Sequence, residues 1–280
     1  MSGTVVLVTG ASTGIGRAAA RRFKAQGFRV LATARKTEDL VSLQAEGFVA
    51  IPLEMADPAS VAACAAAALR EGPPTVLVNN AGYGEMGPIE ETSREAWLRQ
   101  FETNVFGHME LTRLLLPAMR EAGGGRILFT SSVVGRLSVP YLGAYSASKH
   151  ALEAAADALR VEVRPWNIRV TLIEPGPVTT QFSGRVKGTF EPRNAPGSPY
   201  LRAHRRAAKV MELLDRGVKP ETVARVIVRQ ATSAFPRRRR VVGPLPRLGM
   251  PFRAITPAWL IDWASAVILG LTRGNLNRKR

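Results

Sequence analysis

The chain has 280 residues, enough for one α/β domain with a large buried core, and its composition marks no linker. Its single cysteine, Cys64, excludes an intramolecular disulfide and suggests a helix-core thiol in a reducing compartment. The formal net charge of +17 leaves three interpretations open: solubility, polyanion binding, or attraction to an anionic membrane surface. Basic residues are densest after Leu201 without interleaved aromatic residues, so nucleic acid is not an expected partner. The first residues lead into a strand pattern rather than an apolar leader, which predicts a cytoplasmic protein.

Short apolar runs alternate along the chain with segments of helical periodicity. Strands are predicted over residues 5–8, 29–34, 49–53, 75–78, 127–129, 168–173 and 239–242. Helices are predicted over residues 15–23, from 58, over 92–119, from 145, over 203–214 and from 219. This alternation predicts one doubly wound α/β domain over residues 1–280, with a parallel sheet inside and helices on both faces. A ligand is expected across the carboxyl ends of the strands.

A glycine-rich turn follows the first predicted strand. It reads Gly10-Ala11-Ser12-Thr13-Gly14-Ile15-Gly16, a spacing that differs from the commoner G-x-G-x-x-G. A strand, a tight turn and a helix place backbone N–H groups and the positive helix end at one spot, which suits a pyrophosphate. Plain turn chemistry is the alternative, but the position directly after an apolar strand favours nucleotide binding.

The second predicted strand ends in Ala34, Arg35 and Lys36. An NAD-selective fold usually has an acidic side chain here, whereas the 2′-phosphate of NADP calls for a positive one. Arg35 therefore favours NADP(H), although it and Lys36 also fit a solvated strand end. Arg17, at the start of the first helix, is an even choice between a phosphate contact and a surface residue.

The main candidates for chemistry are Tyr145 and Lys149, four residues apart on one expected helix face. A nearby ammonium favours the phenolate, so Lys149 is expected to lower the pKa of Tyr145 and equip it for proton transfer. Ser132 follows the fifth predicted strand, where its hydroxyl can hold a substrate oxygen beside the phenol. A lone Tyr-x-x-x-Lys is more often a pair of neighbours on a helix surface, so the interpretation of this pair as catalytic depends on the other motifs of the chain.

Together the motifs resemble the short-chain dehydrogenase/reductase family, from about Val5 to Thr180 and more loosely to Val242. The resemblance rests on Thr9 to Gly16, Asn79-Asn80-Ala81-Gly82, Asn104, Ser132, Tyr145, Lys149 and Pro175-Gly176. It implies a Rossmann fold and NADP(H)-dependent hydride transfer between an alcohol and a carbonyl compound. No metal ion is expected at the site.

The resemblance also implies roles for individual residues. Tyr145 would be the general acid or base, Lys149 its electrostatic tuner and ribose anchor, Ser132 the carbonyl-orienting group, and Asn104 the holder of a relay water. Further cofactor contacts are implied at Gly10, Ser12, Thr13, Gly14, Ile15, Gly16, Arg35, Asn80, Ala81, Gly82, Pro175, Gly176, Val178 and Thr180. Asn79 is expected to tie strands together and His108 to pack. Glu54 departs from the family's usual aspartate near the adenine.

The resemblance to the family implies fewest residue roles in the C-terminal third of the chain. Residues 181–218 are the predicted substrate lid, and residues 244–280 form an apolar and basic tail. Its apolar stretch, residues 257–271, is too short and too broken for a membrane span. This stretch is expected to close the cleft or pack at a dimer contact, with membrane-surface binding as the alternative. Likeness to hydroxysteroid and retinol dehydrogenases implies a lipophilic substrate, and the family implies a homodimer or homotetramer. A non-catalytic NADP(H) sensor or scaffold at a membrane is the competing function.

Overall fold

A computed structural model describes residues 4–180, 198–214, 217–253 and 255–272. In these residues a parallel seven-stranded sheet has the order β3-β2-β1-β4-β5-β6-β7. Its strands are β1 (Val5–Val8), β2 (Arg29–Ala34), β3 (Val49–Pro52), β4 (Val76–Asn79), β5 (Gly125–Thr130), β6 (Ile168–Pro175) and β7 (Arg239–Val242). The chain winds outward from β1 in one direction and from β4 in the other, so the switch point between them opens a crevice at their carboxyl ends. The predicted doubly wound Rossmann fold is confirmed.

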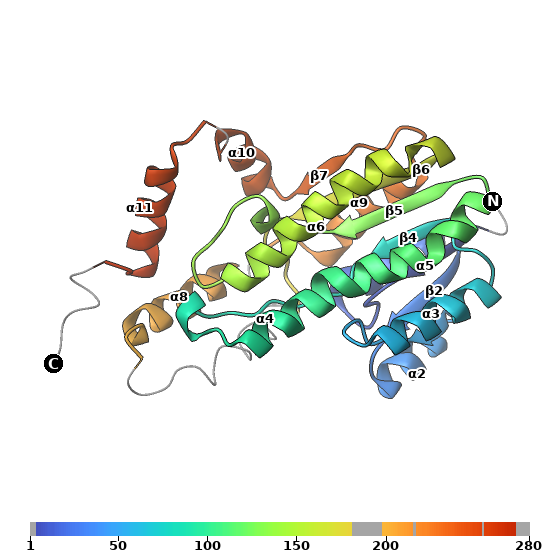
Figure 1. Cartoon of the computed structure of the whole chain (residues 1–280), viewed down its shortest axis with the longest axis horizontal. Helices are drawn as coiled ribbons and strands as arrows, with labels where there is room; N and C mark the ends of the chain where they lie inside the picture. The colour runs from blue at the N-terminus through green and yellow to red at the C-terminus, as the bar shows by residue number, and fades with distance from the viewer. Residues whose placement is uncertain (1–3, 181–197, 215–216, 254, 273–280) are drawn as a thin grey trace.

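Helices connect the strands and cover both faces of the sheet (Figure 1). They are α1 (Gly14–Ala25), α2 (Thr37–Ala45), α3 (Pro58–Arg70), α4 (Arg94–Phe101), α5 (Gly107–Glu121), α6 (Gly143–Glu162), α8 (Leu201–Leu214), α9 (Pro220–Thr232), α10 (Pro244–Arg253) and α11 (Ala258–Leu269). Asp57 caps α3 as predicted, because its side chain accepts the N–H of Ala59. The predicted start at Thr92 is one residue early: Ser93 caps α4 by accepting the N–H of Ala96.

Alternate residues of the central strands face opposite layers. Val5 and Leu7 join one apolar cluster with α3, α5 and α6, whereas Val6 and Val8 join the other with α1 and α9. All four side chains are buried, as expected for a parallel strand covered on both faces. Cys64 of α3 is buried in the first cluster, and burial raises the pKa of its thiol to about 12. The rigid interior fixes the strand ends that carry the site.

The C-terminal helices lie at the end of the molecule remote from the N-terminus (Figure 1). Helix α11 packs against α8, and Leu269 near its end is buried. Trp259 and Trp263 of α11 are exposed by 68% and 62%, so the helix leaves much of its apolar surface uncovered. In the described parts of the chain, no helix combines the length and apolar composition that a membrane crossing requires.

Candidate active site

The turn between β1 and α1 and the start of α1 pack so closely on neighbouring backbone that glycine is needed at certain positions. Gly10 and Gly14 have φ values of +65° and +56°, which L side chains rarely adopt. A Cβ on Gly10 would lie 2.8 Å from Cα of Ala81, and one on Gly16 would lie 2.2 Å from O of Gly10. The glycine spacing therefore allows close packing of the backbone. Gly16 has this packing role alone, because it does not line the cleft at the carboxyl ends of the strands.

A cleft of about 1120 Å³ runs along the carboxyl ends of the strands. The predicted site residues that line it are Gly10, Ser12, Thr13, Gly14, Ile15, Arg35, Asn80, Ala81, Gly82, Ser132, Tyr145, Lys149, Pro175, Gly176, Val178 and Thr180. Residues at the start of α1 thus share one cavity with Tyr145. Ligand sites typically span roughly 300–1,000 Å³, so this cleft is at least as large as most small-molecule sites.

The strand ends are tied together by Thr9 and Asn80. The Thr9 hydroxyl accepts the N–H groups of Asn80 and Ala81 at 2.8 and 2.9 Å, and Nδ2 of Asn80 donates to O of Thr9 at 3.0 Å. The hydroxyl of Thr130 donates to Oδ1 of Asn80 at 3.2 Å, which adds β5. The strand-tying role expected of Asn79 therefore belongs to Asn80, while Asn79 bonds to Thr112 of α5.

His108 is buried, as its expected packing role requires. Its ring nitrogens lie 3.1 Å from Oδ1 of Asn79 and 2.8 Å from O of Ala81. Burial, reinforced by Lys149, lowers the pKa of the imidazole to about 3. The ring is therefore neutral at physiological pH and links α5 to the strand end that lines the cleft.

Arg35 lines the cleft directly after the end of β2, where a dinucleotide fold places the adenosine ribose. Its NH1 is 3.3 Å from Oε2 of Glu54, and the side chain is 69% exposed. Glu54 and Lys36 also line the cleft. Arg35 is thus free to swing toward a ligand at little cost, because an exposed ion pair of this kind contributes about 1 kcal/mol or less.

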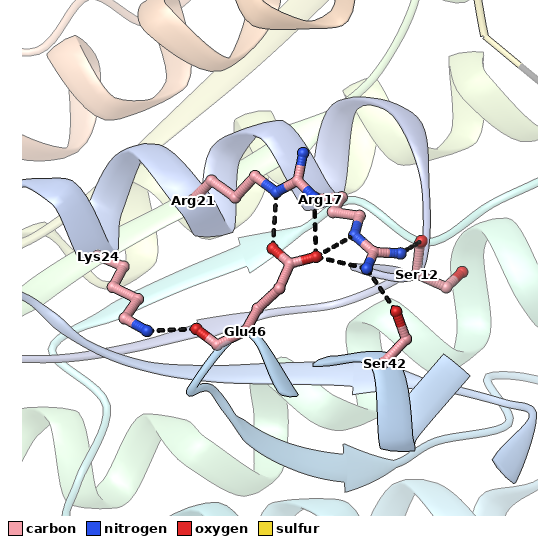
Figure 2. Close-up of polar contacts among 6 residues, drawn as sticks. All are labelled: Ser12, Arg17, Arg21, Lys24, Ser42 and Glu46. Carbon is pink, nitrogen blue, oxygen red and sulfur yellow. Dashed lines mark hydrogen bonds and ion pairs between the residues drawn. The ribbon is translucent and has the colours of Figure 1, made fainter. Parts of the chain in front are cut away.

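The side chain of Arg17 bonds to neighbouring elements of the fold rather than facing the cleft (Figure 2). Its guanidinium donates to Oε1 of Glu46 at 2.8 Å, to O of Ser12 at 2.8 Å and to Oγ of Ser42 at 2.6 Å. Glu46 also accepts from Arg21, and the two guanidinium groups hold its pKa at about 2. Arg17 does not line the cleft, so of its two interpretations the phosphate contact is not supported.

The three residues that carry the predicted chemistry meet at the carboxyl end of β5. Tyr145 is hydrogen-bonded to Ser132, whose Oγ also accepts the N–H of Val134 at 3.3 Å. Nζ of Lys149 donates to O of Thr130 at 2.8 Å and lies 5.8 Å from the centre of the Tyr145 ring. The first two turns of α6 and the end of β5 thus hold a phenol, a hydroxyl and an amine around one point of the cleft.

The pKa of Tyr145 does not follow the expectation from sequence. Burial raises it to about 12, and the hydrogen bond with Ser132 offsets only part of that rise. Burial also lowers the pKa of Lys149 to about 8, with Glu153 acting in the opposite direction. Desolvation is therefore the main cause of both shifts, and at neutral pH the phenol is protonated. A protonated phenol is the form that can donate to a carbonyl oxygen.

Asn104 does not itself line the cleft. It lies in a π-helical turn over residues 102–106, between α4 and α5. Its Nδ2 donates to O of Tyr83 at 3.0 Å and to Oγ of Ser148 at 3.1 Å, and its Oδ1 accepts the N–H of Tyr83 at 3.2 Å. A Cβ on Gly82 would lie 3.0 Å from this oxygen and 3.9 Å from Nζ of Lys149. The π turn, a frequent device at functional sites, explains how an asparagine is accommodated within a helix.

Sequence reasoning missed two features of the site. Ser148 lies within the Tyr145–Lys149 motif, and its hydroxyl donates to O of Tyr145 at 2.7 Å while accepting from Asn104, so it links the two predicted groups. Its spacing of three residues from Tyr145 was the available signal. Glu85 is a buried carboxylate that lines the cleft and pairs with Arg99 at 3.2 Å, and its loop has no pattern that predicts this.

Apolar side chains surround the substrate side of the cleft. Tyr145 belongs to a cluster with Met86, Val134, Tyr141, Leu142, Ala203, Ala207 and Leu269. Ala203 and Ala207 come from α8, so this helix, which falls within the predicted lid, packs on the apolar cluster that includes Tyr145. Residues 181–197 and 215–216 of the predicted lid lie outside the described residues.

Comparison with known proteins identifies the family. The short chain dehydrogenase family matches residues 4–189. The chain belongs to this family. Among curated proteins, an uncharacterized Escherichia coli oxidoreductase, YbbO, is 47% identical over 186 residues, which cover 66% of this chain and 69% of that protein. A 3-ketodihydrosphingosine reductase from Bacteroides thetaiotaomicron is 32% identical, covering 94% of this chain and 95% of that protein.

Solved short-chain dehydrogenases have the same architecture. One from Streptomyces avermitilis superposes with a TM-score of 0.79 at 35% identity, covering 95% of this chain and 98% of that one. A Burkholderia phymatum dehydrogenase in complex with NAD has a TM-score of 0.78 at 27% identity, covering 90% and 93%. An actinorhodin polyketide ketoreductase with NADPH has a TM-score of 0.75 at 31% identity, covering 88% and 99%. The chain is thus an oxidoreductase of a family that uses nicotinamide cofactors.

Proposed function

We propose that the protein transfers a hydride between NADP(H) and a lipophilic alcohol or carbonyl substrate. The observation that carries this proposal is the hydrogen-bonded pair Tyr145 and Ser132 in the wall of the cleft that Gly10, Gly14 and Arg35 also line. The cofactor would supply or accept the hydride. The protein's own residues bind the two reactants and move the proton that accompanies the hydride.

In the reduction, the protonated Tyr145 hydroxyl donates its proton to the substrate oxygen, and Ser132 holds that oxygen by a second hydrogen bond. Lys149 stabilises the phenolate that forms, because its ammonium is the cation nearest to the ring among the described contacts. Asn104 would hold a water that links the Lys149 ammonium to solvent, and through that water and the ammonium the phenolate would regain its proton. In the oxidation each transfer runs in reverse.

The preference for NADP(H) over NAD(H) is supported by Arg35 and Lys36, two cations that line the ribose end of the cleft. A 2′-phosphate there would draw Arg35 away from Glu54. We expect Arg35→Ser to raise the KM for NADPH by roughly tenfold or more, as loss of a charge-assisted hydrogen bond costs about 1.5–3 kcal/mol, and to leave the KM for NADH almost unchanged. A wild-type enzyme with a lower KM for NADH would contradict the preference.

A lipophilic substrate is supported by the apolar wall beside Tyr145. Val133, Val134, Leu137, Val139 and Leu142 all line the cleft there. The 3-ketodihydrosphingosine reductase among the relatives is named for a long-chain carbonyl substrate. Activity should be assayed on ketones and aldehydes of increasing chain length, by the absorbance of NADPH. We expect kcat/KM to rise by about tenfold for each pair of added methylenes that the wall buries, at ~0.8 kcal/mol for each methylene. A kcat/KM independent of chain length would contradict this substrate class.

A further inference from the structure

A second cavity, of about 510 Å³, lies at the edge of the sheet beside β7 and α10. Five arginines line it, together with Val241 and Met250: Arg136, Arg237, Arg239, Arg240 and Arg247. No acidic side chain is part of this lining. The two cavities share no lining residue, so this arginine pocket is distinct from the catalytic cleft.

The inner arginines of the pocket are neutralised by acids beneath them. Nε of Arg239 lies 2.9 Å from Oε2 of Glu153 and 3.2 Å from Oε1 of the fully buried Glu174. NH1 of Arg136 lies 3.5 Å from the other oxygen of Glu174. With the pairs that Asp157 makes to Arg160 and Arg239, this layer contains Arg136, Arg160 and Arg239 against Glu153, Asp157 and Glu174. Its formal charges cancel.

The outer arginines have no such compensation. Within the described part of the chain, Arg237, Arg240 and Arg247 form no ion pair with a carboxylate, and Nε of Arg240 is buried without a hydrogen-bond partner. Arg247 uses its Nε to donate to O of Val241 at 3.2 Å. Burial and repulsion from Arg237, Arg247 and Arg229 lower the pKa of Arg240. Like charges held together this closely are stabilised by a counter-anion.

We propose that this arginine pocket binds a phosphoryl group, held by Arg237, Arg240 and Arg247. Guanidinium groups match the oxygens of a phosphate in two-point hydrogen bonds, and Arg237, Arg240 and Arg247 line one pocket without a carboxylate partner among the described residues. A phosphoryl dianion also offsets more of the uncompensated charge than a carboxylate does. The pocket volume falls within the range of small-molecule sites and exceeds that of free phosphate, so the group belongs to a larger molecule.

Two sources share this chemistry, a soluble phosphate ester and the headgroup of an anionic lipid, and the test separates them. Pyrophosphate and glycerol 3-phosphate are titrated calorimetrically into the 280-residue chain, and the pocket variants described next distinguish binding there from binding in the catalytic cleft. Flotation with phosphatidylcholine vesicles, with and without phosphatidic acid, tests the lipid. Both measurements report binding rather than turnover, so they are independent of the proposed hydride transfer.

The test variant is Arg240→Gln with Arg247→Gln, and the matched control is Arg70→Gln with Arg164→Gln, which removes the same charge at exposed positions elsewhere. We expect the test variant to weaken phosphate-ester or vesicle binding by at least about tenfold, and the control by less than about twofold, as two charge-assisted hydrogen bonds are lost in the first alone. Arg240→Lys with Arg247→Lys keeps the charge and guards against misfolding. It should still lose affinity, because ammonium groups lack the two-point fit.

Each outcome decides the proposal. Selective loss for pyrophosphate or glycerol 3-phosphate supports a soluble ester, and selective loss for phosphatidic acid vesicles alone supports a lipid headgroup. Equal weakening in test variant and control, or no binding of any probe by the parent protein, would overturn the arginine pocket as a phosphoryl site.

Discussion

The cofactor side of the molecule and its C-terminal end use their side chains in opposite ways. Around the cleft, polar groups such as Asn80, Thr9 and Lys149 bond to backbone atoms of neighbouring strands, so each position is fixed by the sheet. At the other end, Trp259 and Trp263 of α11 stand largely in solvent. The contrast teaches that the side chains of the candidate site are held in place by the sheet, whereas the C-terminal end leaves apolar side chains uncovered.

One glycine from each region gives the largest expected contrast in stability. Gly16 and Gly249 both lie in helices, where alanine normally stabilises by about 1 kcal/mol. A Cβ on Gly16 would lie 2.2 Å from O of Gly10, whereas one on Gly249 would meet no atom within 4 Å. We expect Gly16→Ala to lower the free energy of unfolding by about 1–3 kcal/mol through overpacking. Denaturant titration measures the change.

Gly249→Ala is the matched control for that substitution. We expect it to leave stability unchanged or to raise it by up to about 1 kcal/mol. If Gly16→Ala stabilised the protein as much as Gly249→Ala, the tight packing of the glycine turn would be contradicted.

The two histidines of these regions predict a loss of stability in acid. Burial lowers the pKa of His108 to about 3 and also lowers the pKa of His204, which Glu91 opposes. Below about pH 6.5 these histidines are therefore protonated in the unfolded chain but stay neutral in the folded chain. The free energy of unfolding consequently falls as the pH drops from about 6.5 toward 3. Each histidine contributes up to about 1.4 kcal/mol for each pH unit.

The measurement is the midpoint of denaturation from pH 7 to pH 4.5. We expect His108→Gln, which cannot take up a proton, to reduce the steepness of this fall even though it lowers stability at pH 7. An unchanged pH dependence in this variant would mean that His108 is not held neutral in the folded protein.

The smallest effect is expected at α11. Trp263 is 62% exposed, so Trp263→Ala should change the free energy of unfolding by less than about 0.5 kcal/mol. Thermal unfolding of this variant and the parent chain measures the difference. A loss of about 2 kcal/mol or more would show that a further surface covers this tryptophan in solution.

Sequence reasoning succeeded where backbone geometry demands particular residues. The predicted strands over residues 5–8 and 29–34 match β1 and β2, because apolar runs of strand length have few alternatives in this fold. It was less accurate where the outcome depends on three-dimensional competition. The partners of Arg17 are on other elements, the pKa of Tyr145 is set by burial, and the π turn at Asn104 has no sequence signature. The sequence also does not show which arginines of the arginine pocket pair with carboxylates and which do not.

The most direct test of the mechanism replaces Tyr145 by phenylalanine, which removes one hydroxyl and keeps the ring. NADPH binding, followed by cofactor fluorescence, should stay within about twofold of the parent protein, while kcat/KM for the best carbonyl substrate falls by about 10² to 10⁴, the usual contribution of a positioned proton donor. A Tyr145→Phe enzyme that bound NADPH normally and retained the parent kcat/KM would contradict proton transfer by this phenol.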